Sequence, residues 1–272
     1  MLPALLPLLD GTRTVDDLTA HLGSPAGPAI ERALELLGAN GLLVEGPEQD
    51  RGDSPAARVL AAAYGLAPDE AERRLRAASV GVVGAAAAGE EVARLLHAAG
   101  AGDVRRLPWS GGEVDLAIVA PSADEVAKLD AWNLAALDSG VRWLGLRPFD
   151  GHMATVGPLV VPGESCCHEC LLRRLAGHVE YGDDLAAIEA TPPAAGRSPA
   201  LELIAAGVAA HVALCWLGGL DPSLPGVLYA IETRPALALD SHAVLRVPRC
   251  PACSPVQRQA SRVPWHEAVG AP

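Results

Sequence analysis

Two short cysteine motifs constrain the fold of this chain more than any other feature. Cys167 and Cys170 have CxxC spacing, as do Cys250 and Cys253, and about eighty residues separate the two motifs. Each CxxC turn lets two thiolates converge on one ion, and two turns complete the tetrahedral S4 site that structural zinc prefers. Disulfides and a redox motif are the alternatives. A reducing cytoplasm disfavours disulfides, and a redox motif needs no distant second pair, so the spacing favours structural zinc.

Three residues near these motifs receive simpler interpretations. Cys166 falls outside the CxxC spacing and is interpreted as a spare thiol. Cys215 lies in the apolar stretch AAHVALCWLGG, where a cysteine is typically a small core residue. His168 sits inside the first motif, and since four cysteines already complete a site, we expect it to be a solvent-facing loop residue.

From residue 79 onward, predicted strands alternate with predicted helices. Strands are expected at 79–84, 104–107, 115–120, 142–148, 154–162, 227–233 and 242–248, and helices at 89–99, 123–139 and about 199–218. Such alternation is typical of a mostly parallel sheet with helices on both faces. The sequence therefore predicts an α/β, doubly wound, Rossmann-like domain.

The first strand and helix enclose a loop where such folds bind nucleotides. The stretch SVGVVGAAAAG keeps Gly84 and Gly89, but four alanines fill the positions between them. Each added methyl group obstructs the close approach of phosphate to the backbone. No acidic ribose-binding segment follows the second strand, and Lys128 is the only lysine in the chain. We therefore interpret the loop as degenerate and do not expect ATP as a cofactor.

The first 46 residues form a separate small unit. Helices are expected near the start, at TVDDLTAHL after the capping residue Thr14, and at 28–38, followed by the strand LLVEG at 42–46. Three helices and a strand are typical of a winged-helix unit. Residues 47–78 are expected to form a linker and a helix, 79–257 the α/β domain, and 258–272 a tail.

Charge and hydropathy exclude two classes of partner. The net charge is −12, and the first fifty residues hold eight acidic side chains against two arginines. Binding nucleic acid requires the opposite balance, so the winged helix is not expected to bind DNA. No stretch approaches about 20 uninterrupted apolar residues, and the N-terminus lacks the basic region of a secretory signal. We therefore expect a cytoplasmic protein without a membrane span.

Three stretches carry a resemblance to a known family. VGPLVVPGESCCHECLLRRLAG, HVALCWLGGLDP and the closing RCPAC resemble the ThiF/MoeB-like adenylating superfamily over roughly residues 75–257. They are most similar to its cyclodehydratase C-protein, or ocin-ThiF, branch. Proteins of this branch accompany YcaO enzymes in the biosynthesis of azole- and azoline-containing ribosomal peptides, thiopeptides included. The resemblance implies structural zinc on the four CxxC cysteines and a homodimer built on the large domain.

The resemblance also implies a role for the N-terminal unit. LLPLLDGTRTVDDLTAHL is similar to the first two helices of a precursor-peptide recognition element, although this chain begins at the helix, without the strands that usually precede it. A leader peptide would pair with the LLVEG strand and enter the groove beside helix 28–38. The candidate groove residues are Ile30, Leu34, Leu37, Leu42 and Val44. The chain is then an accessory subunit of a YcaO cyclodehydratase; an active adenylating enzyme and a purely structural subunit are the alternatives.

Overall fold

The computed structural model describes residues 2–40, 42–43, 60–61, 63–64, 68–180, 184 and 198–254. The chain divides into two compact units. One comprises Met1–Ala78 with Leu96–Asp103 and Leu214–Pro222, and the other comprises Ser79–Leu95, Val104–Ala213 and Ser223–Pro272. The predicted tail at 258–272 and residues 47–59 of the predicted linker-and-helix segment at 47–78 lie outside the described residues.

The start of the first unit is a trio of helical segments. They are α1 (Leu2–Leu5) with the 3-10 turn η1 (Leu6–Leu8), α2 (Val15–Leu22), and the turn η2 (Ser24–Ala26) leading into α3 (Gly27–Ala39). Thr14 begins α2 with a reciprocal cap: its hydroxyl accepts the Asp17 amide, and the Asp17 carboxylate accepts the Thr14 amide. The trio encloses a small core of Leu5, Leu18, Ile30 and Ala33.

The strand predicted at 42–46 is not formed where the structure describes it. Leu42 lies in a bend and Leu43 has no regular structure, while Val44 and the rest of LLVEG lie outside the described residues. Residues 2–40 are therefore helices, 3-10 turns and short connections, and no strand is described at 42–43. A further helix, α5 (Pro68–Ala77), leads toward the second unit.

The second unit is built on a seven-stranded sheet of order β2-β1-β3-β4-β5-β6-β7. The strands are β1 (Ser79–Val83), β2 (Asp103–Arg106), β3 (Leu116–Val119), β4 (Trp143–Arg147), β5 (Met153–Val160), β6 (Val227–Glu232) and β7 (Ala238–Ala243). β1, β3 and β4 pair in parallel, whereas β4 to β7 pair antiparallel. The prediction of a mostly parallel sheet is wrong, because only five residues join β4 to β5, too few for a parallel crossover.

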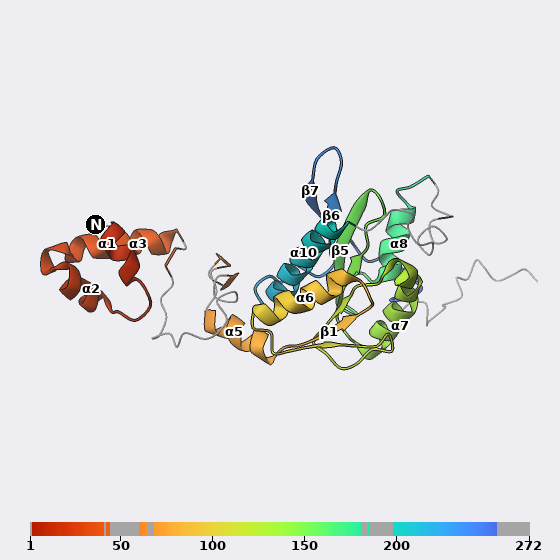
Figure 1. Cartoon of the computed structure of the whole chain (residues 1–272), viewed down its shortest axis with the longest axis horizontal. Coiled ribbons are helices and arrows are strands. Elements are labelled where there is room, and N and C mark those ends of the chain that lie inside the picture. The colour runs from red at the N-terminus through yellow and green to blue at the C-terminus, as the bar shows by residue number, and fades with distance from the viewer. Residues whose placement is uncertain are drawn as a thin grey trace, which may run out of the picture. The chain divides into compact units, whose positions relative to one another are not determined.

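Helices cover both faces of this sheet, as predicted. They are α6 (Ala87–Ala98), η3 (Ala123–Lys128) continuing into α7 (Leu129–Ser139), α8 (His168–Ala176) and α10 (Pro199–Leu217). α6 and α10 lie along one side and α7 and α8 along the other (Figure 1). Neighbouring residues of β1 follow this division: Val82 faces the start of α6 at Gly89, and Val83 packs in a cluster with Trp132 of α7. The helix predicted at 123–139 is formed, but its first part, η3, is a 3-10 helix.

The last strand lies earlier in the chain than predicted. β7 ends at Ala243, whereas the expected strand covered 242–248. Its register is set by the hairpin with β6, in which Glu232 lies opposite Ala238. The residues after β7 are held by α8 instead, since Arg174 donates to the carbonyl oxygens of Leu245 and Arg246. This segment leads directly to the second cysteine motif.

α10 is the described helix whose length and composition would let it cross a membrane. It has 19 residues with a mean hydropathy of 1.9, and 44% of it is buried inside the protein. Ala206, Ala209 and Ala213 are completely buried along it. Packing in the core accounts for its apolar sequence, which a test of hydropathy alone does not separate from a membrane span.

Candidate metal centre and closed nucleotide loop

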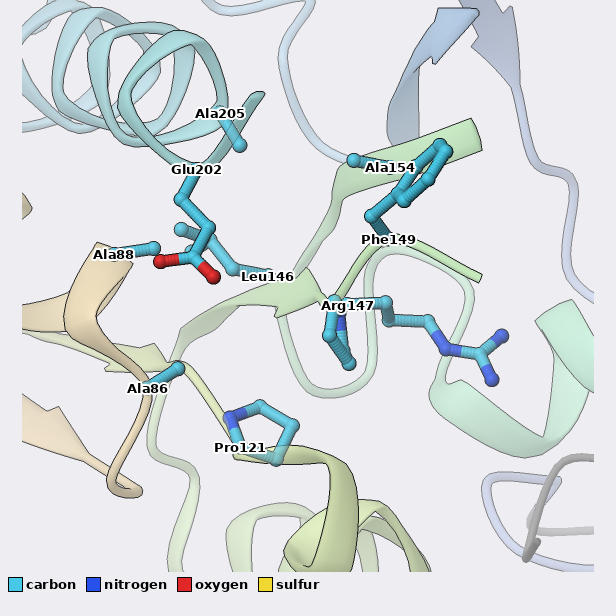
Figure 2. Close-up of a pocket in the computed structure, with 10 residues that line it drawn as sticks. Ala86, Ala88, Pro121, Leu146, Arg147, Phe149, Ala154, Glu202 and Ala205 are labelled. Atoms are coloured by element: carbon cyan, nitrogen blue, oxygen red, sulfur yellow. The ribbon is translucent and has the colours of Figure 1, made fainter. Parts of the chain in front are cut away.

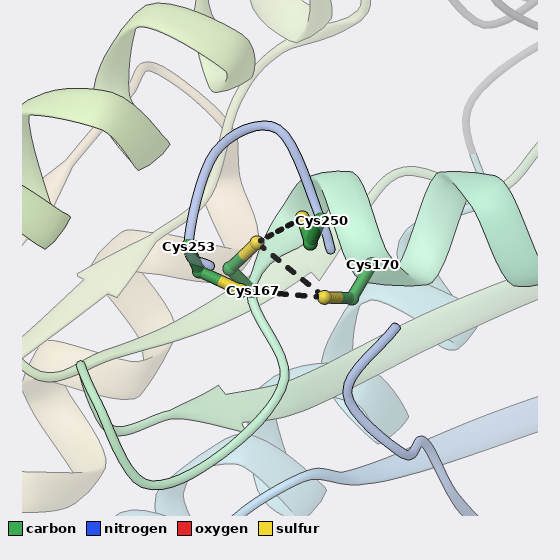
Figure 3. Close-up of side chains that lie close together, drawn as sticks. All are labelled: Cys167, Cys170, Cys250 and Cys253. Carbon is green, nitrogen blue, oxygen red and sulfur yellow. Dashed lines mark hydrogen bonds between the residues drawn. The ribbon is translucent and has the colours of Figure 1, made fainter. Parts of the chain in front are cut away.

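The structure brings the four CxxC cysteines together. Cys167 immediately precedes α8 and Cys170 lies in its first turn, while Cys250 and Cys253 lie in the turn that follows β7 (Figure 3). The Sγ atom of Cys167 lies 3.8 Å from the Sγ atom of Cys170 and 3.7 Å from that of Cys250. The Sγ atoms of Cys170 and Cys253 are 3.5 Å apart. All four sulfur atoms lie within 4.8 Å of one another.

These separations fit a tetrahedral metal site. Four sulfur ligands at about 2.3 Å from one zinc ion lie about 3.8 Å apart at the corners of a tetrahedron. A disulfide would instead require about 2.05 Å between two sulfur atoms. Cys167, Cys170 and Cys250 are fully buried and Cys253 is half-buried. The cluster is therefore closed to solvent on most sides and could hold a metal ion such as zinc.

The surroundings lower the pKa of one of these thiols and raise the pKa of two others. The hydrogen bond from Cys167, with another donated by the Val247 amide at 3.3 Å, lowers the pKa of Cys170 to about 4. Burial raises the pKa of Cys253 to about 11, and the pKa of Cys167 is also raised. Four thiolates this close repel one another, so the complete set of charges is tolerated only beside a cation.

The structure agrees with the prediction for Cys166 but not with the prediction for His168, the two residues on either side of Cys167. Cys166 is buried, does not belong to the group of four, and burial raises the pKa of its thiol to about 12, consistent with an inert spare thiol. The prediction of a solvent-facing His168 is wrong, because only 6% of the residue is exposed. As the first residue of α8 it donates its amide to the Asn133 side chain of α7 and packs its ring against Trp143.

The two glycines of the degenerate loop have packing roles. Gly84 has φ +93°, and a Cβ there would lie 2.2 Å from the carbonyl oxygen of Ala120 at the end of β3. A Cβ on Gly89 would lie 3.0 Å from the Ala120 Cβ and 3.1 Å from Val82. Gly84 therefore requires glycine because of its positive φ and the nearby carbonyl group, and at Gly89 the absence of a side chain allows close helix–strand packing, whether or not the loop binds phosphate.

A carboxylate of the protein itself occupies the loop. Glu125 of η3 accepts a hydrogen bond from the Ala85 amide at 2.7 Å and from the Ser122 amide at 3.2 Å. Its other oxygen accepts from the Trp109 indole at 3.0 Å and from Lys128 at 3.1 Å. An amide that would face phosphate in a nucleotide-binding loop thus already has an anionic partner.

Lys128, the only lysine, lies nearer to this loop than its position in the sequence suggests. Its ammonium group pairs with Glu125 and lies 5.3 Å from the centre of the Trp109 ring. The sequence pattern Ser122-x-x-Glu125 could have indicated a helix cap, and that cap is formed. The reach of the same carboxylate to Ala85 depends on the tertiary fold and has no signal in the local sequence.

Removing this carboxylate charge is expected to destabilise the second unit. Burial alone would raise the pKa of Glu125, but hydrogen bonds from Trp109, Ala85 and Lys128 outweigh it and lower the pKa to about 2. The stabilisation is therefore present above the ordinary pKa of 4.5 and is lost as pH falls from there toward 2. Glu125→Gln should lower the free energy of unfolding at pH 7 by about 2 kcal/mol.

Urea unfolding of both proteins, followed by circular dichroism, measures this difference. The stability gap between the two should narrow below pH 4.5, where the unfolded carboxyl group takes up its proton. Asp124→Asn is the matched control, because Asp124 occupies the same turn but is exposed. An equal effect of the two substitutions would show that the contacts to the loop are not responsible.

The cavity beside the loop is also small. Its volume is about 30 Å³, close to the space of one water molecule, whereas sites for small molecules typically occupy about 300–1,000 Å³. Ala86 and Ala88 form one side, and the Glu202 carboxylate of α10 points toward Ala88 (Figure 2). The Arg147 side chain extends away from these residues. Among the described residues, the methyl groups and Glu202 leave no nucleotide-sized space.

A larger groove lies on the helical trio of the first unit. It has a volume of about 1080 Å³, and its lining includes Leu34 and Leu42 from the predicted set. Leu42 is 73% exposed, and it faces the same groove as Val15 of α2. Ile30 has no exposed surface and packs in the core of the trio. Leu37 is half-buried and is not part of the lining, and Val44 lies outside the described residues.

The fold, a mixed sheet with helices on both faces, is also found in solved structures of other proteins. No protein-family model matches the sequence, and no curated protein matches it. A heterocyclase in complex with substrate and cofactor is similar in structure, with a TM-score of 0.68 and 24% identity. The match covers 92% of this chain and 35% of that chain.

Two further structures extend this likeness. The heterocyclase TruD has a TM-score of 0.65 and 24% identity over 94% of this chain and 39% of its own. E. coli MccB with AMPCPP and MccA has a TM-score of 0.63 and 16% identity over 88% of this chain and 85% of its own. This chain thus spans little more than a third of the heterocyclases but most of MccB. At these identities the likeness establishes the fold.

Proposed function

We propose that this chain is an accessory subunit in the biosynthesis of azole- or azoline-containing ribosomal peptides, thiopeptides included. It binds the leader of a precursor peptide through residues 1–46 and presents the core peptide to a separate YcaO cyclodehydratase. The likeness to the heterocyclases carries this proposal: a heterocyclase in complex with substrate and cofactor matches 92% of this chain with a TM-score of 0.68. The protein acts in the cytoplasm, as a homodimer built on the ThiF/MoeB-like domain at 79–257.

The occupied loop supports a role without adenylation. The Glu125 carboxylate already binds the Ala85 amide, and the cavity beside the loop has the volume of a water molecule. ATP would have to displace a carboxylate that accepts hydrogen bonds from two backbone amides, an indole and an ammonium group. The likeness to MccB with AMPCPP favours the alternative of an active adenylating enzyme. That alternative requires ATP–pyrophosphate exchange, which our proposal excludes.

Zinc in the cysteine cluster would be structural in this role. Four protein ligands leave no open coordination position for a substrate or an activated water molecule. Cys167, Cys170, Cys250 and Cys253 would tie the start of α8 to the segment after β7 and so fix the end of the domain. The chemistry of ring formation would take place on the partner.

The groove on the helical trio is the proposed leader site. Leu34 and Leu42 offer apolar contacts from α3 and from the segment that follows it. Because Leu42 is 73% exposed, its side chain is free to become buried against an apolar leader residue. Pairing of the leader with a strand at 42–46 remains a prediction, since most of that segment lies outside the described residues.

Leu42→Asp is expected to weaken leader binding at least about tenfold, which corresponds to about 1.4 kcal/mol. The change places a charge in the groove at a position that contributes little to the folded core. Leu36→Asp is the matched control, because Leu36 is 55% exposed on α3 but does not line the groove. Fluorescence anisotropy with a labelled leader peptide measures both. Equal weakening by the two variants would place the leader elsewhere.

A further inference from the structure

The two edges of the sheet in the second unit differ in chemistry. β2 forms one edge, and three of its four residues, Asp103, Arg105 and Arg106, are charged and exposed. Arg106 is paired with Glu90, and Arg105 donates to the carbonyl oxygen of Glu113. Charged side chains of this kind prevent a further strand from pairing with an edge.

β7 forms the other edge and carries one charged side chain, that of Asp240, against three in β2. It contains no lysine, arginine or proline, and its six residues pair with β6 without a bulge. The leucines around it are exposed: Leu237 by 62%, Leu239 by 53% and Leu245 by 65%. Figure 1 shows the β6–β7 hairpin extending beyond the helices that cover the rest of the sheet. An exposed apolar edge of this kind favours pairing with another strand.

The sequence around β7 is complementary to itself when reversed. Residues 237–245 are LALDSHAVL, with Ser241 at the centre. In an antiparallel pair of two copies centred there, Asp240 would lie opposite His242 and Leu239 opposite Ala243. Leu237 and Leu245 are equally far from the centre and would flank the pair. An acidic side chain thus meets an imidazole, and apolar residues meet apolar residues, as cross-strand pairs require.

We propose that β7 of one copy pairs with β7 of a second copy about a two-fold axis at Ser241. Such an interface uses the same surface on both subunits, so it closes as a dimer and leaves neither β7 edge exposed. The two seven-stranded sheets would become continuous. This inference rests on the proposed homodimer and assigns its interface; it is independent of leader binding.

Cysteine cross-linking tests both the surface and the register. In the proposed pair the two Ser241 side chains lie opposite each other, with Cβ atoms about 4.5–5.5 Å apart, so Ser241→Cys should form a disulfide between subunits after a small adjustment. Leu237→Cys is the matched control. Its two copies would lie eight residues apart along the strands, about 27 Å, too far for a disulfide. Each protein is mildly oxidised and the linked dimer is detected by non-reducing electrophoresis. The wild type gives the background level of linkage.

We expect a covalent dimer from Ser241→Cys and only wild-type background from Leu237→Cys. If light scattering shows a dimer but Ser241→Cys is not selectively cross-linked, the β7 interface is wrong and the homodimer is retained. A monomeric wild type at micromolar concentration would overturn both. Circular dichroism of each variant shows whether the fold is retained.

A charge exchange provides a second test that needs no oxidation. Asp240→Lys would face His242 of the second copy and should raise the dimer dissociation constant at least about tenfold. Combining it with His242→Glu restores opposite charges across the axis and should recover dimerisation. Weakening without recovery, or no weakening at all, would contradict the proposed register.

Discussion

Replacing Cys170 by serine is expected to abolish zinc binding and unfold the second unit. Cys170 contacts Cys167 at 3.8 Å and Cys253 at 3.5 Å, so it joins the two CxxC motifs directly. Binding of structural zinc contributes about 10–16 kcal/mol in zinc-finger peptides, whereas a whole domain is typically stable by about 5–15 kcal/mol. Loss of the ion should therefore exceed the stability margin of the domain.

Metal analysis and thermal unfolding of the purified protein measure this effect. The wild type should contain about one zinc ion per chain, and a strong chelator should reproduce the unfolding caused by Cys170→Ser. Cys166→Ser is the matched control, because Cys166 is an equally buried neighbour that lies outside the group of four. A metal-free protein with an unchanged melting temperature would contradict the account, as would equal metal loss from both variants.

Omitting this chain from a reaction with the proposed partner cyclodehydratase is expected to slow ring formation by about 10²–10³-fold at low precursor concentration. Tethering the leader raises the effective concentration of the core peptide at the partner's active site, without requiring strong affinity for the core itself. The same loss should follow from deleting the leader, since either change breaks the tether. Mass spectrometry detects each ring as the loss of one water molecule.

The concentration dependence distinguishes tethering from catalysis. At high precursor concentration the rates with and without this chain should converge, because the partner performs the chemical step. Leu42→Asp should slow ring formation less than omission of the chain does, and Leu36→Asp should leave the rate at its wild-type value. A rate gap that persists at saturating precursor would mean that this chain contributes to the chemical step.

Local patterns in the sequence predict much of this molecule. The two CxxC motifs predict the cysteine cluster, because a four-cysteine site has strict spacing and few alternatives. Thr14 predicts the start of α2, since its hydroxyl accepts the Asp17 amide as a capping residue does. The strand and helix around Gly84 and Gly89 are where the apolar pattern places them. The cap and the strand–helix pattern depend on residues a few positions apart, whereas the cysteine cluster also depends on contact between two motifs about eighty residues apart.

Interactions between distant segments account for what was missed. His168 was expected in solvent, but α7 supplies an acceptor for its amide through Asn133. The alanines predict a degenerate loop, but they give no indication of the contact between Glu125 and Ala85, which joins residues forty positions apart. The antiparallel orientation of β5 is an exception, because the five-residue connection from β4 already indicates it within the local sequence.

The most direct test of recognition without adenylation is one titration, performed with and without ATP and Mg²⁺. A labelled leader peptide is added to the zinc-loaded chain alone, and anisotropy reports binding. The account predicts a dissociation constant in the micromolar range or tighter, unchanged by millimolar ATP, because Glu125 occupies the loop. Absence of leader binding, or binding that strengthens with ATP and is accompanied by pyrophosphate exchange, would contradict it.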